Sequence, residues 1–179
     1  MAATQWIETP VVVDEDVIRR GNVLEIIDPV WWSADFYQDK ARYELSLSRF
    51  TRPQRLVWAI SWYQSEVFNG GHDQFFDNST GMVWHDALEG LKEVGAEPVA
   101  AVLAEAVRRL GGSPSFDREE RQDQLSALYE AGGTLSDLDE AFFAMPARFD
   151  LEATVLAYIR SNAAAFHFDG VVKRPPRSR

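Results

Sequence analysis

The chain has 179 residues, which is enough for one domain with a buried core and few for two. It contains no cysteine, and this excludes disulfides, thiol nucleophiles and thiolate metal ligands. Aspartate and glutamate number 28 against 18 lysines and arginines, a formal net charge of −10 that disfavours direct binding to nucleic acid and favours a basic protein partner. A simpler explanation is that the negative charge only keeps the protein soluble.

The negative charge belongs to the body of the chain. Residues 169–179 hold one acid, Asp169, and the bases Lys173, Arg174, Arg177 and Arg179. No apolar run reaches the roughly 18 residues of a membrane span, and the first residues lack the basic start and apolar core of a signal peptide. We therefore expect a cytoplasmic protein that does not contact a membrane.

The first part of the chain predicts an arm and then a helix. Residues 1–13 read as an irregular extended arm, because β-branched residues follow Pro10. Acids at 14–16 favour the start of a helix that ends at Asp28-Pro29. The aromatic residues that follow are expected to fill a core: Trp31, Trp32, Phe36, Tyr37 and Tyr43.

The clearest helix start lies at Thr51. Thr51 and Gln54 have the spacing of a capping box, and Pro53 occupies the first turn, where its missing N–H does no harm. This helix is expected to run to about Phe68 and to be central, because it is apolar over most of its circumference. After a kink at Gly70-Gly71, residues 72–78 predict a short continuation.

The second half predicts further helices and a tail. Apolar spacing and glycine, proline or acidic boundaries place them at about 82–94, 98–110, 119–131 and 136–144, with a last helix after Asp150. The predicted fold is therefore all-α: one compact multi-helix domain over 14–168, with the arm at 1–13. Residues 169–179 are expected to be a disordered basic tail.

Residues 66–81 combine polar, aromatic and glycine residues in a pattern that predicts a structural turn or a pocket. Buried polar groups beside aromatic rings need hydrogen-bond partners, and amides that hold a turn are commoner than amides that hold a ligand. The residues of this motif are Glu66, Asn69, Gly70, Gly71, His72, Gln74, Phe75, Phe76, Asn78 and Gly81.

The chain offers little that points to catalysis or metal binding. Its histidines, His72, His85 and His167, do not have the spacing of a metal site, although His72 and His85 could approach each other near several aspartates. Asn69-Gly70-Gly71 follows a helix and lacks the lysine of a phosphate-binding loop, and Ser79 lacks a nucleophile elbow. We expect no catalytic residue, no metal and no cofactor.

The motif carries a resemblance to a known family. Glu66-Val67, Asn69-Gly70-Gly71, Gln74-Phe75-Phe76 and Asn78-Ser79-Thr80-Gly81 resemble the signature of the bacterial DNA-mimic protein family, long catalogued as a domain of unknown function. The similarity extends over roughly residues 50–145, through Val94-Gly95-Ala96, Glu120-Arg121 and 138–143. His72 departs from the pattern, which has an aromatic or apolar residue there.

The resemblance implies a non-catalytic acidic protein that binds a basic DNA-binding protein, a transcription factor or a nuclease, and is compatible with a homodimer. The acids expected to form the binding surface are Glu119, Glu120, Asp123, Asp137, Asp139, Glu140, Asp150 and Glu152. Several of them could instead serve only to stabilise a helix, because an acid near a helix N-terminus interacts favourably with the helix dipole. The alternative function is a small-molecule-binding domain or enzyme with a pocket at Glu66, Asn69, His72, Gln74 and Asn78.

Overall fold

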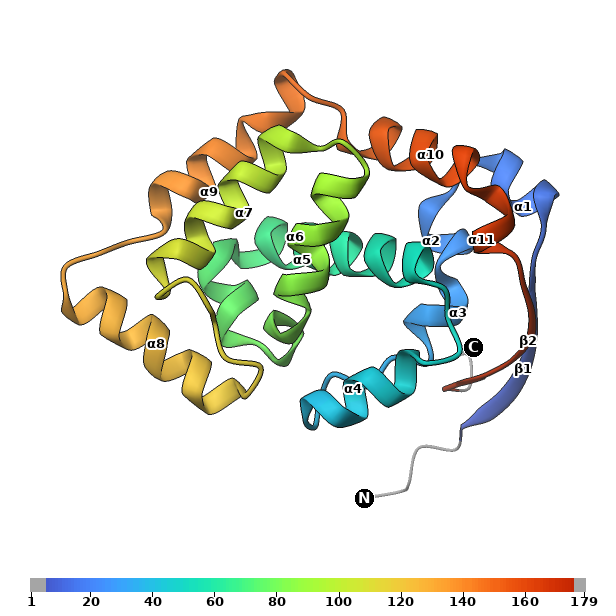
Figure 1. Ribbon diagram of the computed structural model, residues 1–179, viewed down its shortest axis with the longest axis horizontal. Coiled ribbons are helices and arrows are strands. Elements are labelled where there is room, and N and C mark those ends of the chain that lie inside the picture. The colour runs from blue at the N-terminus through green and yellow to red at the C-terminus, as the bar shows by residue number, and fades with distance from the viewer. Residues whose placement is uncertain (1–5, 176–179) are drawn as a thin grey trace.

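The computed structural model describes residues 6–175, and most of these residues are helical (Figure 1). The mainly helical prediction is confirmed, but the all-α class is too narrow because two strands pair. The elements are β1 Ile7–Val13, α1 Glu15–Arg20, α2 Val23–Ile26, α3 Asp28–Trp31, α4 Lys40–Leu47, α5 Arg52–Asp77, the 3-10 helix η1 Ser79–Val83, α6 Trp84–Glu93, α7 Glu97–Arg109, α8 Arg118–Glu130, α9 Ser136–Phe143, the 3-10 helix η2 Met145–Ala147, α10 Leu151–Ser161, α11 Ala163–Phe166 and β2 Phe168–Arg174.

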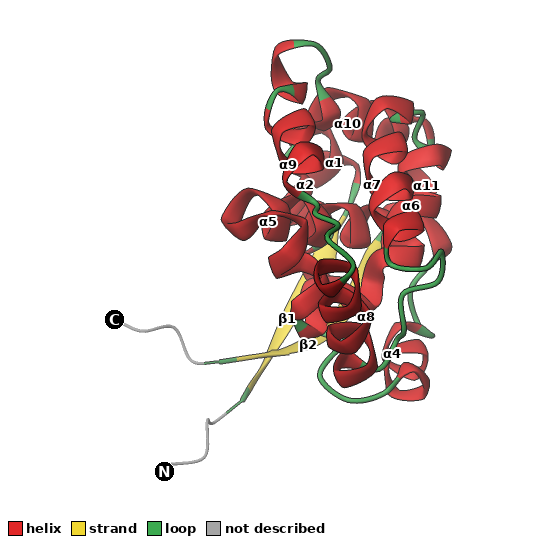
Figure 2. Cartoon of the chain, turned by 90° about the vertical axis from the view of Figure 1, so that its left-hand side faces the viewer, coloured by secondary structure: helices red, strands yellow, loops and turns green. Residues whose placement is uncertain are grey.

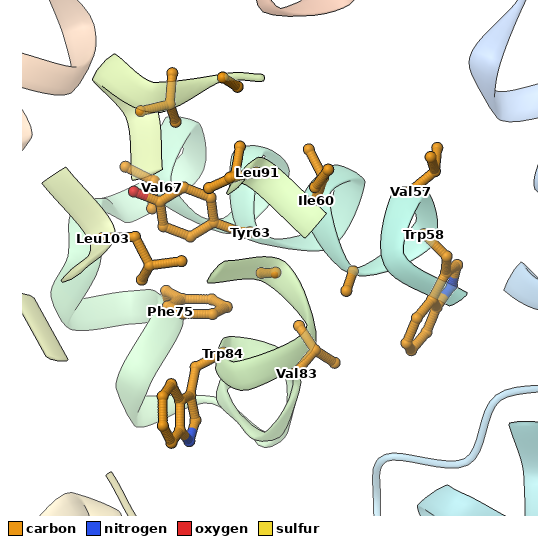
Figure 3. Close-up of a cluster of buried hydrophobic side chains, with 14 of the residues drawn as sticks. Val57, Trp58, Ile60, Tyr63, Val67, Phe75, Val83, Trp84, Leu91 and Leu103 are labelled. Carbon is orange, nitrogen blue, oxygen red and sulfur yellow. The ribbon is translucent and has the colours of Figure 1, made fainter. Parts of the chain in front are cut away.

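Helix α5 is the centre of the fold, as the sequence predicts. The capping box at its start is present: the Thr51 side chain accepts from the Gln54 N–H, and the Gln54 side chain accepts from the Thr51 N–H. η1, α6, α8 and α9 pack around α5, and Figure 3 shows Ile60, Tyr63 and Val67 of this helix facing side chains from the later elements. Its burial is that of a core helix rather than a surface helix.

The aromatic residues before α5 form one side of this core, except Trp32, which is partly buried outside the core cluster, and Tyr37. Phe36, Tyr43 and Trp58 are buried, and Trp31 stacks on Trp62 with ring centroids 4.4 Å apart. Tyr37 is 75 % exposed, so the expectation that it fills the core is wrong.

The helix predicted from residue 14 to Asp28-Pro29 is divided. Gly21 takes a left-handed conformation (φ 73°) that ends α1, and the Asn22 side chain then caps α2. Asp28-Pro29 starts α3 instead of ending the segment. The division agrees with the exposure of Leu24, which a single amphipathic helix would have turned inward.

The predictions of an irregular N-terminal arm and a disordered C-terminal tail are wrong for the described residues, which form two paired strands. β1 and β2 form an antiparallel pair from Ile7 opposite Arg174 to Val13 opposite Phe168. Figure 2 shows this ribbon running beside the helices and extending beyond them. Val13 and Val172 are buried against the body. Residues 1–5 of the predicted arm and 176–179 of the predicted tail lie outside the described residues.

Candidate functional site

The polar residues of the 66–81 motif converge on one carboxylate. Glu66, on α5, is only 7 % exposed. Its oxygens accept hydrogen bonds from Gln74 Nε2 (2.8 Å), Asn78 Nδ2 (3.0 Å) and Thr80 Oγ1 (2.8 Å). One side chain thus ties the main part of α5 to its last turn and to η1. Asn69 is exposed and lies outside this cluster.

The Gly70-Gly71 kink is shaped by a residue from α9. Neither glycine has helical backbone angles, and Gly71 has a φ of 75°. Asp139 Oδ1 lies against the kink and accepts from the His72 backbone N–H (2.8 Å) and from His72 Nδ1 (2.6 Å). A Cβ atom at Gly71 would lie 2.5 Å from Asp139 Oδ2. The expected kink is confirmed, and its partner carboxylate comes from 67 residues later.

The imidazole of His72 is fully buried between Asp139 and Tyr63. Since Nδ1 donates to the carboxylate, Nε2 accepts from the Tyr63 hydroxyl at 2.9 Å. Burial lowers the pKa of His72, although the bond to Asp139 opposes that shift. Burial also raises the pKa of Tyr63 well above its ordinary value, so the hydroxyl stays protonated and able to donate to Nε2.

Gly71→Ala is expected to destabilise the protein by about 3 kcal/mol. The methyl group would both impose an unfavourable backbone conformation and push Asp139 away from His72. The measurement is urea unfolding. Gly95→Ala is the control for a positive φ, because Gly95 has a φ of 82° with no atom near its absent Cβ. Gly71 also has a ψ of −175°, a combination that essentially only glycine adopts, so its larger loss includes this backbone strain as well as the displaced carboxylate. Equal losses in the two variants would contradict a role for the Asp139 contact.

A buried arginine completes the turn; in the sequence it belongs to the Glu120-Arg121 segment of the family resemblance, but no local pattern predicts its burial. Arg121 of α8 is fully buried. It donates to the carbonyls of Phe76 (2.7 Å), Asn78 (2.7 Å) and Ser115 (2.7 Å). Burial lowers its pKa to about 10, which leaves it cationic at neutral pH. The guanidinium therefore holds α8 against the C-terminal end of α5, whose carbonyl dipoles favour a positive charge.

Other motif residues serve this packing. Phe75 and Phe76 are fully buried, with ring centroids 5.0 Å apart. A Cβ atom at Gly81 would lie 2.6 Å from Arg121 Nε and 2.5 Å from the Phe75 carbonyl oxygen. Gly81 is thus the residue that lets the arginine approach. The buried polar side chains of the motif, Glu66 and His72, are thus hydrogen-bonded by other protein groups.

The predicted acidic surface is divided among different roles. Asp139 is held by His72, and Asp137 forms a bidentate pair with Arg109 (2.5 and 2.7 Å). Asp150 caps α10 by accepting from the Ala153 N–H. Glu140 and Glu152 are exposed on α9 and α10. These five acids therefore do not form one array.

The acids of α8 do share a surface. Glu119, Asp123 and Glu130 lie within about 40° of one another around a helix of 3.6 residues per turn, on the side opposite the buried Arg121 and Leu125. They are exposed, and within the described residues they form no ion pair. Glu120, also exposed, accepts from Ser115 Oγ at 2.8 Å. Glu130 was not among the acids predicted from the sequence. We call Glu119, Asp123 and Glu130 the α8 acidic face.

The histidines lie in separate contacts. His85 is half exposed and its Nε2 is 3.9 Å from Glu89 Oε1, while His167 faces Glu15 at 3.1 Å. His85, Asp86 and Glu89 have ligand atoms close enough for a cation, but Arg55 binds Asp86 through Nε (2.6 Å) and Nη2 (3.1 Å), and Arg52 pairs with Glu89. These arginines already balance the carboxylates, which disfavours a metal ion there.

A second charged network, which local sequence patterns do not predict, joins α4, α5 and α6. Arg55 binds Glu44 (2.6 and 3.0 Å) as well as Asp86, and Tyr43 donates to Asp86. The network lines a hollow of about 460 Å³ beside Trp84 and Phe116. With Lys40 and the Arg52–Glu89 pair, which also line it, the hollow has three bases and three acids and so carries no net formal charge.

The chain matches one protein family over most of the region just described. The family model described as DMP19-like protein matches residues 48–162, more than half of the chain. The chain belongs to the DMP19-like family. This supports the resemblance to a DNA-mimic family and extends it beyond residue 145. Neither the curated proteins nor the solved structures contain a significant match to this DMP19-like chain.

Among the described residues of this DMP19-like protein, no helix is both long enough and apolar enough to span a bilayer. The family match includes the Glu66 cluster, the Gly70-Gly71 kink and α8. It does not include β1 or β2.

Proposed function

We propose that this protein is a non-catalytic DNA mimic that binds a basic DNA-binding protein, a transcription factor or a nuclease, through α8. The observation that carries the proposal is the α8 acidic face, where exposed carboxylates lack the arginine partners that several other acids in the fold have. Membership of the DMP19-like family supports the same function.

The spacing on α8 suits this role. With a rise of about 1.5 Å per residue, Glu119 and Asp123 are about 6 Å apart along the helix axis, and Asp123 and Glu130 about 10.5 Å. These intervals are of the same order as the separation of phosphates along a DNA strand, which has one phosphate for about every 3.4 Å of axis. Figure 1 shows α8 at an outer corner of the molecule, where a partner could reach it. A homodimer would extend this surface and stays a prediction.

The motif is better explained as support for α8 than as a pocket. Gln74 and Asn78 direct their amide groups at Glu66 rather than at a free volume, and His72 is enclosed by Tyr63 and Asp139. No observation favours the small-molecule alternative. Arg121 of α8 donates to carbonyls of the motif and so fixes the position of the α8 acidic face.

The first test is capture of a partner from a bacterial lysate at low salt, followed by purification of what is bound. The captured protein is expected to bind duplex DNA, and the DMP19-like protein should displace that DNA. Because the attraction is between exposed charges, affinity should fall by at least about tenfold between roughly 0.05 M and 0.5 M salt. Binding that is insensitive to salt, or that leaves the DNA in place, would contradict the proposal.

The site is tested with matched charge variants. Glu119→Gln, Asp123→Asn and Glu130→Gln together should weaken binding by about tenfold or more, mainly through slower association. The control is Glu8→Gln, Glu97→Gln and Asp169→Asn, which removes the same formal charge from exposed positions on β1, α7 and β2. Equal effects in the two triple variants would mean that net charge, not α8, determines affinity.

A further inference from the structure

Two adjoining hollows lie on a different part of the surface from α8. One, of about 500 Å³, is bounded by α2, α5 and α10, and the other, of about 320 Å³, by α5, η2 and the start of α10. They share Gln64, Phe68, Leu151 and Glu152. Together they make a continuous groove that none of the functions assigned above uses.

The groove is apolar and has firm walls. Val23, Leu24, Ile60 and Val155 line the first hollow, and Phe142, Met145 and Phe149 line the second. Trp31 at the edge of the first hollow is fixed by its stack on Trp62, and Phe68 packs edge-on against Phe142 with centroids 5.2 Å apart. Leu24 is 60 % exposed and Phe68 47 %. Large apolar side chains exposed together along a groove are typical of an interaction site.

The charges of the groove are of one sign. Among the residues that line it, Asp150 and Glu152 carry the formal charges, and no lysine or arginine is present. Asp150 is engaged by the Ala153 N–H, whereas Glu152 is exposed at the junction of the two hollows. An apolar groove with an acidic edge complements a segment that is apolar on one side and basic beside it.

We propose that this groove receives an amphipathic helix with lysine or arginine beside its apolar stripe, presented by the basic partner. The inference rests on the proposed function in naming the partner as basic. From Ile60 to Phe68 α5 extends about 12 Å, which matches roughly two turns of a docked helix before the second hollow adds length. The helix would place an apolar anchor against Leu24 and Phe68 and a cation near Glu152.

The probe is a peptide of about 14 residues made of leucine and lysine, with leucine at helical i, i+3, i+4, i+7 spacing. A second peptide has the same composition in alternating order, and a third has glutamate in place of lysine. Fluorescence anisotropy is expected to show binding of the first peptide at least about tenfold tighter than of either other peptide. Equal binding of all three would overturn the proposal, as would no binding of the first.

Variants locate the peptide. Leu24→Ala with Phe68→Ala should weaken the first peptide by about tenfold or more, and Glu152→Gln by a smaller factor. Leu45→Ala is the matched control, since Leu45 is 66 % exposed on α4 away from the groove, and it should change nothing. Circular dichroism checks that each variant is folded. Unchanged affinity in folded Leu24→Ala, Phe68→Ala protein would overturn the assignment.

Analytical ultracentrifugation tests whether a second copy of the chain, instead of a partner helix, fills the groove. If the protein is a dimer that dissociates in the Leu24→Ala, Phe68→Ala variant and not in Leu45→Ala, a second copy fills the groove and the proposal is wrong. The peptide experiment needs no DNA-binding partner, so its failure is distinct from the failure of DNA displacement in the test of the proposed function.

Discussion

Arg121→Met is expected to destabilise the protein by about 4 kcal/mol. Methionine fills much of the same volume, but it leaves the carbonyls of Phe76 and Ser115 without the arginine donor in a site that water does not reach. The Asn78 carbonyl also loses its bond to the arginine and keeps only the Gly81 N–H at 3.0 Å. Each buried acceptor that loses its partner costs about 1–3 kcal/mol. Part of this loss is offset, because the methionine variant no longer has to bury a desolvated charge. For a chain of this length the loss corresponds to a melting temperature lower by about 10 °C.

The measurement is thermal unfolding followed by circular dichroism, with hydrogen exchange of α8 as a local readout. Arg118→Met is the matched control, because Arg118 lies on the same helix but is half exposed, and its interaction with Asp77 is of the kind that contributes less than about 1 kcal/mol. We expect the amides of α8 to exchange faster in Arg121→Met alone. Similar melting temperatures for the two variants would contradict the role given to the buried guanidinium.

Glu66→Ala is expected to cost about 3 kcal/mol. The substitution leaves the donors of Gln74, Asn78 and Thr80 without their shared acceptor, and it opens a small cavity beside α5. Gln74→Ala removes one donor and keeps the carboxylate, so its cost should be nearer 1 kcal/mol. The order of the two losses follows from the number of groups left unpaired.

Chemical unfolding in urea measures this difference, and Glu130→Ala is the control. Glu130 is an exposed helical glutamate without an ion pair among the described residues, and its replacement should change stability by less than about 0.5 kcal/mol. A Glu66→Ala protein as stable as the control would mean that the carboxylate does not hold the turn. The ligand-binding interpretation of the motif would then regain support.

Glu66 and Arg121 also connect the motif to the proposed function. Glu66 fixes the course of the chain after the Gly70-Gly71 kink, and Arg121 then uses the carbonyls of that turn to hold α8. The α8 acidic face is therefore positioned by the core, while the carboxylates themselves need no partner within the protein. The motif and the surface are parts of one arrangement.

The sequence by itself determined the features that depend on a few neighbouring residues. Thr51 and Gln54 define the start of α5, Gly70-Gly71 its kink, Gly95 the end of α6 and Asp150 the start of α10. Each of these depends on a local hydrogen bond or on a backbone angle that glycine adopts most readily, so the residue type and its spacing carry the information. The family resemblance rests mainly on residues 66–81, which include the Gly70-Gly71 kink.

Only the tertiary structure decided the features that join distant residues. The pairing of β1 with β2, the contact of Asp139 with His72 and the burial of Arg121 each join segments that are remote in sequence. Asp137 and Asp139 look alike in the sequence, yet one pairs with Arg109 on the surface and the other enters the core. A charged residue predicts exposure on average, and its burial depends on whether folding brings it a partner. That partner is set by the packing of helices, which local sequence does not specify.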